Sequence, residues 1–350
     1  MSRASQFFTR RRWLAAGTLF AALAFVVGSF AIAEAVRYAR APTHIAIEAT
    51  PIAAFDTRDP SKTRFGQLNF RGGLALTSKF EAFGGVSAIQ MEPDGAHFLA
   101  VTDQSSWLRG RIVYRDGRPA GIADAEMAPM LGPDGKPLAA RHWYDTESLA
   151  QGNDGLFYVG IERVEKIVRF DYRRYGLMAR GQPIAVPPDF KTFTYNKSLE
   201  CLAAPPTSAP LAGSLVAITE RSLDAAGNHR SFIIKGAKFT RFSVKRSEGF
   251  DVSDCTILPP GDLLLLERRY SPLLGVAVRI RRLHLADIKE GALVDGPALF
   301  FADLGYQIDN MEGIGVHRNA RGETILTLVS DDNFSAIQRN LLLQFELVGD

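Results

Sequence analysis

Acidic residues recur at matched places along this 350-residue sequence, and their type and spacing could carry chemistry. The clearest copy is Asp309-Asn310-Met311-Glu312-Gly313-Ile314, which leads through an apolar segment to Asp331 and Asp332. Four looser copies lie upstream. Aligned on their first polar position, the matched residues are Ser87, Glu147, Glu200, Asp254 and Glu312, at spacings of 60, 53, 54 and 58 residues.

A second acid ends the second apolar segment of each copy. These residues are Asp103, Glu162, Glu220, Glu267 and Asp331 or Asp332. Carboxylates that face one another repel unless a positive charge lies among them. Surroundings rich in oxygen and poor in histidine suit Ca²⁺ far better than Zn²⁺. We predict a calcium site with the ligands Glu147, Glu200, Asp254, Glu312 and Asp331. We predict as catalytic residues Glu147, Glu200 and Glu312.

Arginines offer an alternative source of positive charge, because Arg163, Arg221 and Arg268 directly follow the second acids of their repeats. Adjacent side chains on an extended strand point in opposite directions, so such an arginine would pair with an acid of a neighbouring repeat. For any single pair this bracing is the favoured interpretation, whereas a shared site is favoured for the three repeated glutamates. The predicted substrate-binding residues, for an anionic substrate, are Lys197, Arg163, Arg221 and Arg268.

Motifs of several other catalytic classes are missing from the sequence. It contains no nucleophile elbow, zinc-protease motif, P-loop or dinucleotide glycine motif. Ser87 could act as a nucleophile, but a small residue selected for packing is the favoured interpretation. His142 and His317 lie near repeat starts and could reach a site, although an isolated histidine is usually structural or solvent-exposed.

The elements that would position these residues are β-strands. Pro93-Asp94-Gly95, Asn153-Asp154-Gly155 and Pro260-Gly261-Asp262 are typical hairpin turns between apolar segments. A period in the fifties with several strands per unit predicts an all-β fold, a single β-propeller. Five repeats predict five blades. We expect a sixth from the strands before Ser78 together with Leu341-Leu347, so that strands from both chain ends close the ring.

The N-terminus predicts export. Arg10-Arg11-Arg12 precedes an apolar run from Trp13 to Ile32, and the segment resembles a twin-arginine signal. Cleavage is favoured over retention as a membrane anchor, although the run is long enough to cross a bilayer. The predicted organisation is an export signal at 1–35, a tether at 36–44 and the propeller at 45–350, located in the periplasm or secreted. A formal charge of +3 without a clustered basic face argues against nucleic-acid binding.

Cys201 and Cys255 are the two cysteines, and they lie at equivalent positions of successive repeats. An oxidising compartment permits a disulfide between them. Equivalent positions of neighbouring blades need not meet the Cα separation of about 4.4 to 6.8 Å that a disulfide requires. We favour two unpaired, buried side chains.

Several segments together resemble a known family. They are Asp145-Thr146-Glu147-Ser148-Leu149-Ala150, Leu265-Leu266-Glu267-Arg268-Arg269-Tyr270-Ser271-Pro272, Asp309-Asn310-Met311-Glu312-Gly313-Ile314 and Leu326-Thr327-Leu328-Val329-Ser330-Asp331-Asp332-Asn333-Phe334. These segments closely resemble the phytase-like family described as having esterase-like activity of phytase, over about Phe65 to Leu347. The resemblance implies an exported propeller, phosphomonoester hydrolysis and, through propeller phytases, Ca²⁺. Ser87-Ala88 and Asp254-Cys255 depart from the family's usual pattern, but neither change removes a carboxylate.

Three functions follow as hypotheses. The first is a periplasmic Ca²⁺-dependent hydrolase of small anionic phosphate esters that acts at the propeller channel. The second is a non-catalytic propeller that binds a ligand or a protein partner. The third is a lactone or carboxyl-ester hydrolase. In each case we expect a monomer whose contact with the membrane requires an uncleaved N-terminal anchor.

Overall fold

The computed structural model describes residues 37–193, 197–273 and 275–349, and the predicted export signal lies outside this range. Residues Arg37–Asp350 form one unit. The described chain is all-β, with helices of three to five residues: α2 (Tyr172–Tyr175), η1 (Ala139–Arg141), η2 (Gly176–Met178), η3 (Pro188–Thr192) and η4 (Leu285–Asp287). None of the described helices is long and apolar enough to cross a membrane.

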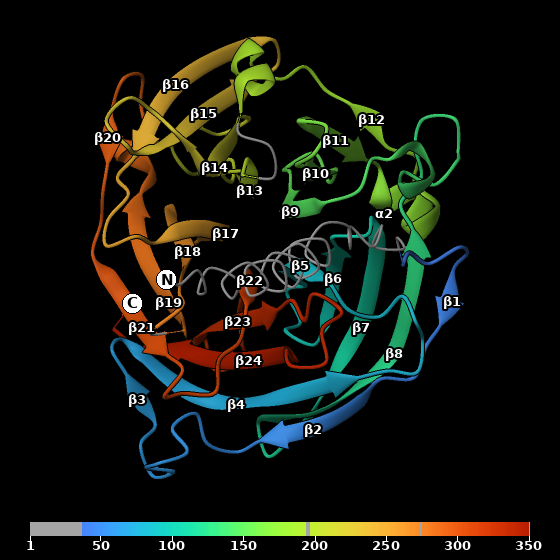
Figure 1. Ribbon diagram of the computed structural model, residues 1–350, viewed down its shortest axis with the longest axis vertical. Coiled ribbons are helices and arrows are strands. Elements are labelled where there is room, and N and C mark those ends of the chain that lie inside the picture. Colours follow the sequence, from blue (N-terminus) through green and yellow to red (C-terminus); the bar gives the residue numbers. More distant parts are fainter. Residues whose placement is uncertain (1–36, 194–196, 274, 350) are drawn as a thin grey trace, which may run out of the picture. The chain divides into compact units, whose positions relative to one another are not determined.

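The described strands form five sheets, which are the blades of a β-propeller (Figure 1). Blade 1 contains, from the axis outward, β5 (Val86–Met91), β6 (His97–Thr102), β7 (Ser106–Arg115), β8 (Arg118–Pro129) and β1 (Thr43–His44). Blade 2 contains β9 (Thr146–Gln151), β10 (Phe157–Ile161), β11 (Lys166–Phe170) and β12 (Gln182–Pro183). The predicted all-β propeller is confirmed.

Blades 3 and 4 follow the same plan, and their strands are antiparallel except for β20, which pairs parallel with β16. Blade 3 contains β13 (Leu199–Ala203), β14 (Leu215–Leu223), β15 (His229–Lys235), β16 (Lys238–Val244) and β20 (Leu293–Val294). Blade 4 contains β17 (Asp251–Leu258), β18 (Asp262–Ser271), β19 (Gly275–His284) and β21 (Ala298–Asp303).

Blade 5 combines strands from both ends of the chain. Its members are β22 (Met311–Arg318), β23 (Thr324–Ser330), β24 (Asn340–Leu347), β4 (Leu68–Thr77) and β2 (Glu48–Ile52), with β3 (Arg64–Phe65) beside β4. Because β24 pairs with both β23 and β4, the strands predicted for a sixth blade extend the sheet of the fifth repeat instead. The predicted count of six blades is therefore corrected to five.

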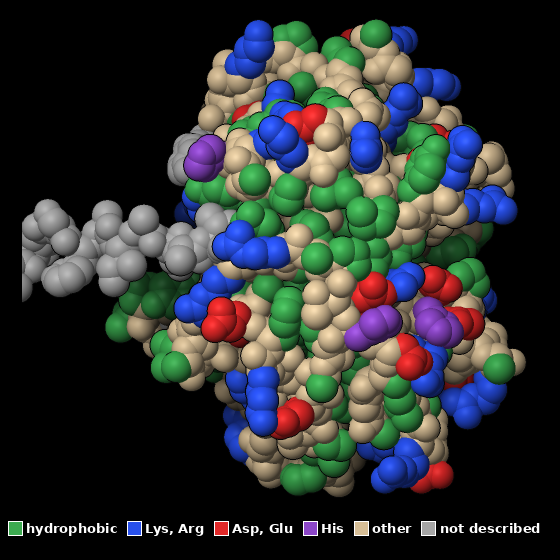
Figure 2. Space-filling view, turned by 90° about the vertical axis from the view of Figure 1, so that its right-hand side faces the viewer, with side chains coloured by type: hydrophobic (Ala, Val, Ile, Leu, Met, Phe, Trp, Pro, Cys, Tyr) green, Lys and Arg blue, Asp and Glu red, His purple; other side chains and the backbone are tan. Residues whose placement is uncertain are grey.

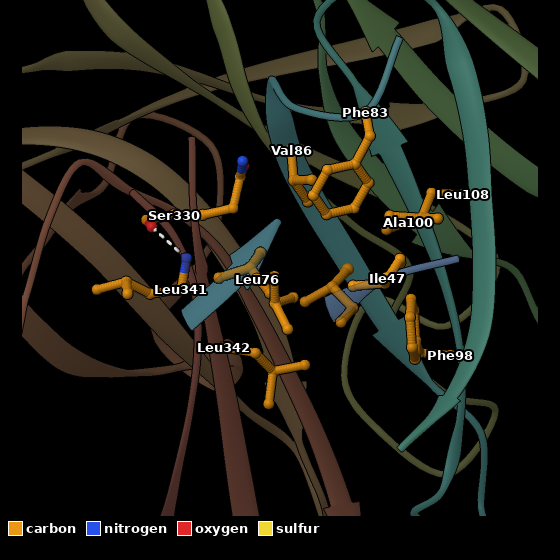
Figure 3. Close-up of a pocket in the computed structure, with 13 residues that line it drawn as sticks. Ile47, Leu76, Phe83, Val86, Phe98, Ala100, Leu108, Ser330, Leu341 and Leu342 are labelled. Atoms are coloured by element: carbon orange, nitrogen blue, oxygen red, sulfur yellow. Dashed lines mark hydrogen bonds between the residues drawn. The ribbon is translucent and has the colours of Figure 1, made fainter. Parts of the chain in front are cut away.

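The innermost strands of the five blades contact one another in cyclic order, and β22 returns to β5. Apolar side chains fill the spaces between neighbouring sheets. One apolar cavity of about 20 Å³ remains between blades 5 and 1, lined by Phe83, Val86, Leu76 and Leu342 among others (Figure 3). Such a lining offers water few hydrogen bonds, so this cavity contributes to packing and suggests no reactive site.

A disulfide joins the innermost strands of blades 3 and 4. It links Cys201 of β13 to Cys255 of β17, whose Cα atoms lie 5.1 Å apart. The favoured interpretation of two unpaired cysteines was wrong, because adjacent blades approach closely at their innermost strands, within the distance that a disulfide spans.

Residues 37–44, predicted as a tether, make contacts with blade 1. The backbone nitrogen of Ala39 donates to Ser106 Oγ at 3.0 Å, and β1 pairs with β8. One side of the unit carries interspersed acidic and basic side chains (Figure 2). A basic stripe of the kind that tracks nucleic acid is not visible on this face.

Candidate functional site

Each innermost strand carries a β-bulge near its beginning, where one residue has no partner on the neighbouring strand. The bulge residues are Ser87, Glu147, Glu200, Ser253 and Glu312. A bulge leaves its extra residue unpaired and redirects the side chain. Three glutamates are therefore displayed at equivalent places around the propeller axis, as the repeat predicted.

A second set of acids lies beside the bulges, where the second strand of each blade ends. The backbone nitrogens of Asp103, Glu162, Glu220 and Asp331 each donate to the carbonyl two residues before a bulge residue. In blade 4 the corresponding position holds Arg268, which faces Asp251 across the β17–β18 pair. We name the seven acids the acid floor: Asp103, Glu147, Glu162, Glu200, Glu220, Glu312 and Asp331.

Blade 4 departs from the predicted alignment by one residue on both strands. Its bulge residue is Ser253, and the predicted ligand Asp254 instead accepts a hydrogen bond from the backbone of Ile314 in blade 5, at 2.8 Å. Glu267 falls one residue before the position of the second acids. Asp254 was matched to the bulge by its charge, and a one-residue slip on a strand turns the side chain to the other face.

Glu267 belongs to a separate, arginine-paired cluster within blade 4. Its Oε2 lies 2.8 Å from Arg279 Nε, and its Oε1 lies 2.7 Å from Arg281 Nη2. Arg281 also contacts Asp295 at 2.7 Å. Glu267 is 0% exposed, so this carboxylate is bound by two guanidiniums away from solvent. Both arginines belong to β19 of the same blade, so this structural pairing differs from the predicted one, in which an arginine braces an acid of a neighbouring repeat. Arg221 with Asp251 and Arg268 with Glu312 form that predicted pairing.

Three carboxylates of the acid floor are close enough to share one cation. Oxygen atoms of Glu162, Glu200 and Glu220 all lie within 4.8 Å of one another, and all three residues are buried. Glu162 Oε1 accepts a hydrogen bond from the backbone of Ser198, whereas Glu200 Oε2 is buried and has no hydrogen-bond partner within residues 37–193, 197–273 and 275–349. Lys197 Nζ lies 2.9 Å from Glu220 Oε2. A buried carboxylate oxygen without a partner is costly, and a bound cation would remove that cost.

Burial and mutual repulsion raise the pKa values of the acids in the floor. Burial raises the pKa of Glu162 to about 8, and the charge of Asp145 adds to the rise. Burial likewise raises the pKa of Glu200 well above its usual value, with further contributions from Glu162 and Glu147. The pKa of Glu147 is raised well above its usual value by burial and by Asp145. Shifts of this size at a cluster are typical of functional sites.

The predicted ligands Glu312 and Asp331 belong to blade 5, and Asp103 of blade 1 interacts with Asp331. Burial raises the pKa of Glu312 although Arg268 opposes the rise, and the two side chains form an ion pair. Burial also raises the pKa of Asp331 well above its usual value, and the charge of Asp103 contributes. Burial raises the pKa of Asp103 to about 7. Glu312 thus has a cationic partner in an ion pair, whereas Glu200 forms no ion pair with a residue that the structure describes.

The predicted substrate-binding residues all lie beside the acid floor, and each is already paired. Arg163 Nε donates to Asp145 at 2.7 Å, and Arg221 Nε donates to Asp251 at 2.9 Å. Lys197 pairs with Glu220, and Arg268 with Glu312. All four side chains keep between 23% and 49% exposure, so an anion could contact them from solvent.

Some residues of the site were missed or misjudged from sequence. Glu162 and Glu220 were recognised as second acids of their repeats but were not predicted as calcium ligands. Their matched positions at the end of the second strand could have placed them in the ligand set. Ser87 Oγ bonds a backbone carbonyl of its own repeat at 3.4 Å. His317 is buried near the far end of β22, and His142 is exposed before β9. Neither histidine joins the three-carboxylate cluster.

Comparisons with known proteins gave a family match and several similar solved structures. A sequence family described as phytase-like, with esterase-like activity of phytase, matches residues 81–334. A comparison with curated proteins gave no match. Similar solved structures include virginiamycin B lyase from Staphylococcus aureus, at 10% identity and a TM-score of 0.40, covering 87% of this chain and 100% of that one. A luciferin-regenerating enzyme shows 9% identity and a TM-score of 0.41, covering 85% and 95%.

Proposed function

Because the chain belongs to the phytase-like family described by the esterase-like activity of phytase, we propose that it is an exported, calcium-dependent ester hydrolase. Its substrates in this proposal are small phosphate esters, and the acid floor is the reaction site. One observation carries the proposal: Glu162, Glu200 and Glu220 form a cluster of three buried carboxylates, of which Glu220 pairs with the ammonium group of Lys197.

The residues of the floor fit a hard divalent cation. All the side chains of the cluster offer carboxylate oxygens, and Glu200 Oε2 is buried with no partner among the described residues. Calcium takes six to eight oxygen ligands in flexible geometry, which neighbouring carboxylates of the floor can supply. Glu162, Glu200 and Glu220 would hold the ion. When bound, it would neutralise an ester phosphate and increase the acidity of water.

Glu147 is the best placed general base. It sits at a bulge next to the cluster and is half-buried, whereas Glu200 and Glu312 are buried. Burial raises its pKa, and a higher pKa makes a carboxylate a stronger base toward water. Lys197 and Arg268 border the floor on two sides and keep part of their surface exposed. They would bind the anionic group of the substrate and so fix the orientation of the ester in the site.

Calcium titration tests the cation site directly. Chelator-treated protein should bind Ca²⁺ in a calorimeter and show a higher melting temperature with the ion. Glu200→Gln should lose both responses, whereas Asp124→Asn, at a 69% exposed side chain on blade 1, should keep them. The proposal fails if chelator-treated protein neither binds Ca²⁺ nor releases phosphate from a broad panel of esters when Ca²⁺ is added.

A binding function is the second candidate, because all four basic residues of the site are already paired with acids. In that case the floor is neutralised mainly from within, and a ligand binds without being cleaved. Ligand-induced stabilisation without calcium dependence would favour it. Turnover of lactones or carboxyl esters, but of no phosphate ester, would instead favour the third hypothesis.

A further inference from the structure

Two adjoining hollows lie at the end of the propeller opposite to the acid floor, at the seam between blades 5 and 1. The floor surrounds the beginnings of β5 and β22, whereas the larger hollow borders the hairpins that follow the ends of these strands. Along this seam β4 of blade 5 contacts β8 of blade 1 (Figure 1). The volumes are about 280 and 270 Å³, and Arg71, Gly117 and Arg321 line both hollows. Each volume is close to the lower limit of about 300 Å³ for small-molecule pockets. We name the two hollows the seam groove.

The base of the larger hollow is held in place by hydrogen bonds that cross the seam. Gln344 Nε2 of β24 donates to Tyr114 Oη of β7 at 2.9 Å, and this hydroxyl donates to the carbonyl of Gly95 at 2.7 Å. Gly95 lies so close to His317 that a Cβ added there would be 2.4 Å from the imidazole. The aromatic ring and the imidazole are therefore fixed relative to each other at the base of the groove.

One wall of the groove presents hydrogen-bond donors that a single carboxylate orients. Glu323 Oε2 accepts from Arg71 Nη2 at 2.5 Å and from Arg321 Nη2 at 2.8 Å. The same oxygen accepts from Asn319 Nδ2 at 2.7 Å. A guanidinium carries five N–H donors, so Arg321, whose side chain is 66% exposed, retains donors for a ligand.

The lining also carries hydrogen-bond acceptors. Asp94 borders the larger hollow, and Asp116 and Glu346 border the other. His317 is 9% exposed, and its Nδ1 is buried with no hydrogen-bond partner among the residues that the structure describes. An anionic ligand would be repelled by the three carboxylates, whereas a hydroxyl group both donates and accepts. The lining therefore suits a ligand rich in hydroxyl groups better than an anion.

We propose that the seam groove binds a neutral saccharide, at a site separate from the acid floor. Sugar hydroxyls accept from Arg71 and Arg321 and donate to Asp94. The apolar face of the sugar ring packs on Tyr114, which is 36% exposed, beside Ile325 of the same hollow. The inference requires neither a metal ion nor ester hydrolysis.

Titration of the full chain with neutral sugars tests this site by nuclear magnetic resonance. The imidazole of His317 is the reporter in protein with isotope-labelled histidine, and its signal is identified by its absence from His317→Gln. The probes are maltose, cellobiose and lactose as free sugars, dextran as a polysaccharide, and inorganic phosphate and citrate as anions. We expect a saturable shift of the His317 signal with a sugar and none with either anion.

Arg321→Ala removes donors from the wall and should weaken sugar binding roughly tenfold, as expected for a lost hydrogen bond to a charged group. Arg241→Ala is the matched control, because Arg241 forms an exposed pair with Asp189 at blade 3 and should leave binding unchanged. An unchanged melting temperature checks that each variant is folded.

Three results would overturn the saccharide site. They are no saturable shift with any of the sugars, a saturable shift with phosphate or citrate, and equal weakening by Arg321→Ala and Arg241→Ala. A shift with dextran but with no disaccharide would identify the ligand as part of a polysaccharide chain. The titration is performed in chelator, and Glu200→Gln should bind the sugar as the unchanged protein does. Failure of this site and failure of the proposed hydrolase are therefore distinguishable.

Discussion

Two groups of buried carboxylates, one in blade 4 and one formed by blades 2 and 3, are neutralised in different ways. In the arginine-paired cluster, Glu267 binds Arg279 and Arg281. In the acid floor, Glu162, Glu200 and Glu220 lie together, and Lys197 forms an ion pair with Glu220. Glu267 is adjacent on β18 to Arg268, which pairs with Glu312 of the acid floor.

The comparison shows what burial of an acid requires. Two guanidiniums with short hydrogen bonds satisfy both oxygens of Glu267, and nothing is left for a ligand to supply. At the floor one oxygen of Glu200 is buried and accepts no hydrogen bond from the part of the chain that the structure describes, and burial raises the pKa of the neighbouring Glu162. Neighbouring buried carboxylates repel one another, so such a cluster is stable only if protons or a bound cation neutralise its negative charge. The first group therefore leaves no carboxylate oxygen for a ligand, whereas the second has carboxylate oxygens that a cation could bind.

Removing an arginine from the paired cluster should have the largest effect on stability. Arg281→Met leaves Glu267 buried with half of its counter-charge, and breaking a buried pair in this way costs about 3–5 kcal/mol. Urea unfolding measures the loss. The matched control is Arg241→Met, whose side chain is 73% exposed and pairs with Asp189, and it should change stability by less than about 1 kcal/mol. Similar losses for both variants would contradict the assigned structural role.

The pH dependence of the metal-free protein should reveal the acid floor. The pKa of Glu162 is about 8 in the folded state and near 4.5 when unfolded, so the folded state holds the extra proton between these values. Stability should therefore fall as pH rises from about 5 to about 8 and become flat above, and Ca²⁺ should reduce the fall. Thermal melts across this window measure it. Glu162→Gln should flatten the slope, and an unchanged slope would show that other groups titrate.

Neutralising one floor carboxylate should give the smallest change, with the opposite sign. Glu200→Gln removes a buried like charge, so metal-free protein at pH 8 should gain about 1 kcal/mol, equivalent to less than one pKa unit. Chemical unfolding with and without chelator measures it. The same variant should abolish Ca²⁺ stabilisation. A loss of stability in chelator would mean that Glu200 is braced like Glu267.

Much of the fold and part of the site could be predicted from the sequence. The period in the fifties and the hairpin turns predict an all-β propeller, because each repeat needs neighbours to bury its two faces. The matched glutamates Glu147, Glu200 and Glu312 are found at the bulges of three blades. Repeat spacing and turn residues are properties of the local sequence, so these features can be predicted without knowledge of the tertiary contacts.

Register, blade count and pairing were decided only by the tertiary structure. A bulge adds one residue to one strand, and Ser253-Asp254 or Glu267-Arg268 can be aligned in two ways until hydrogen bonds choose between them. The terminal strand joined blade 5 because β23 and β4 both offered it an edge. Cys201 and Cys255 pair because neighbouring blades bring their Cα atoms to 5.1 Å. Contacts between residues far apart in the sequence decide the register, the blade count and the disulfide pairing. The repeated acids, in contrast, can be recognised from the sequence alone.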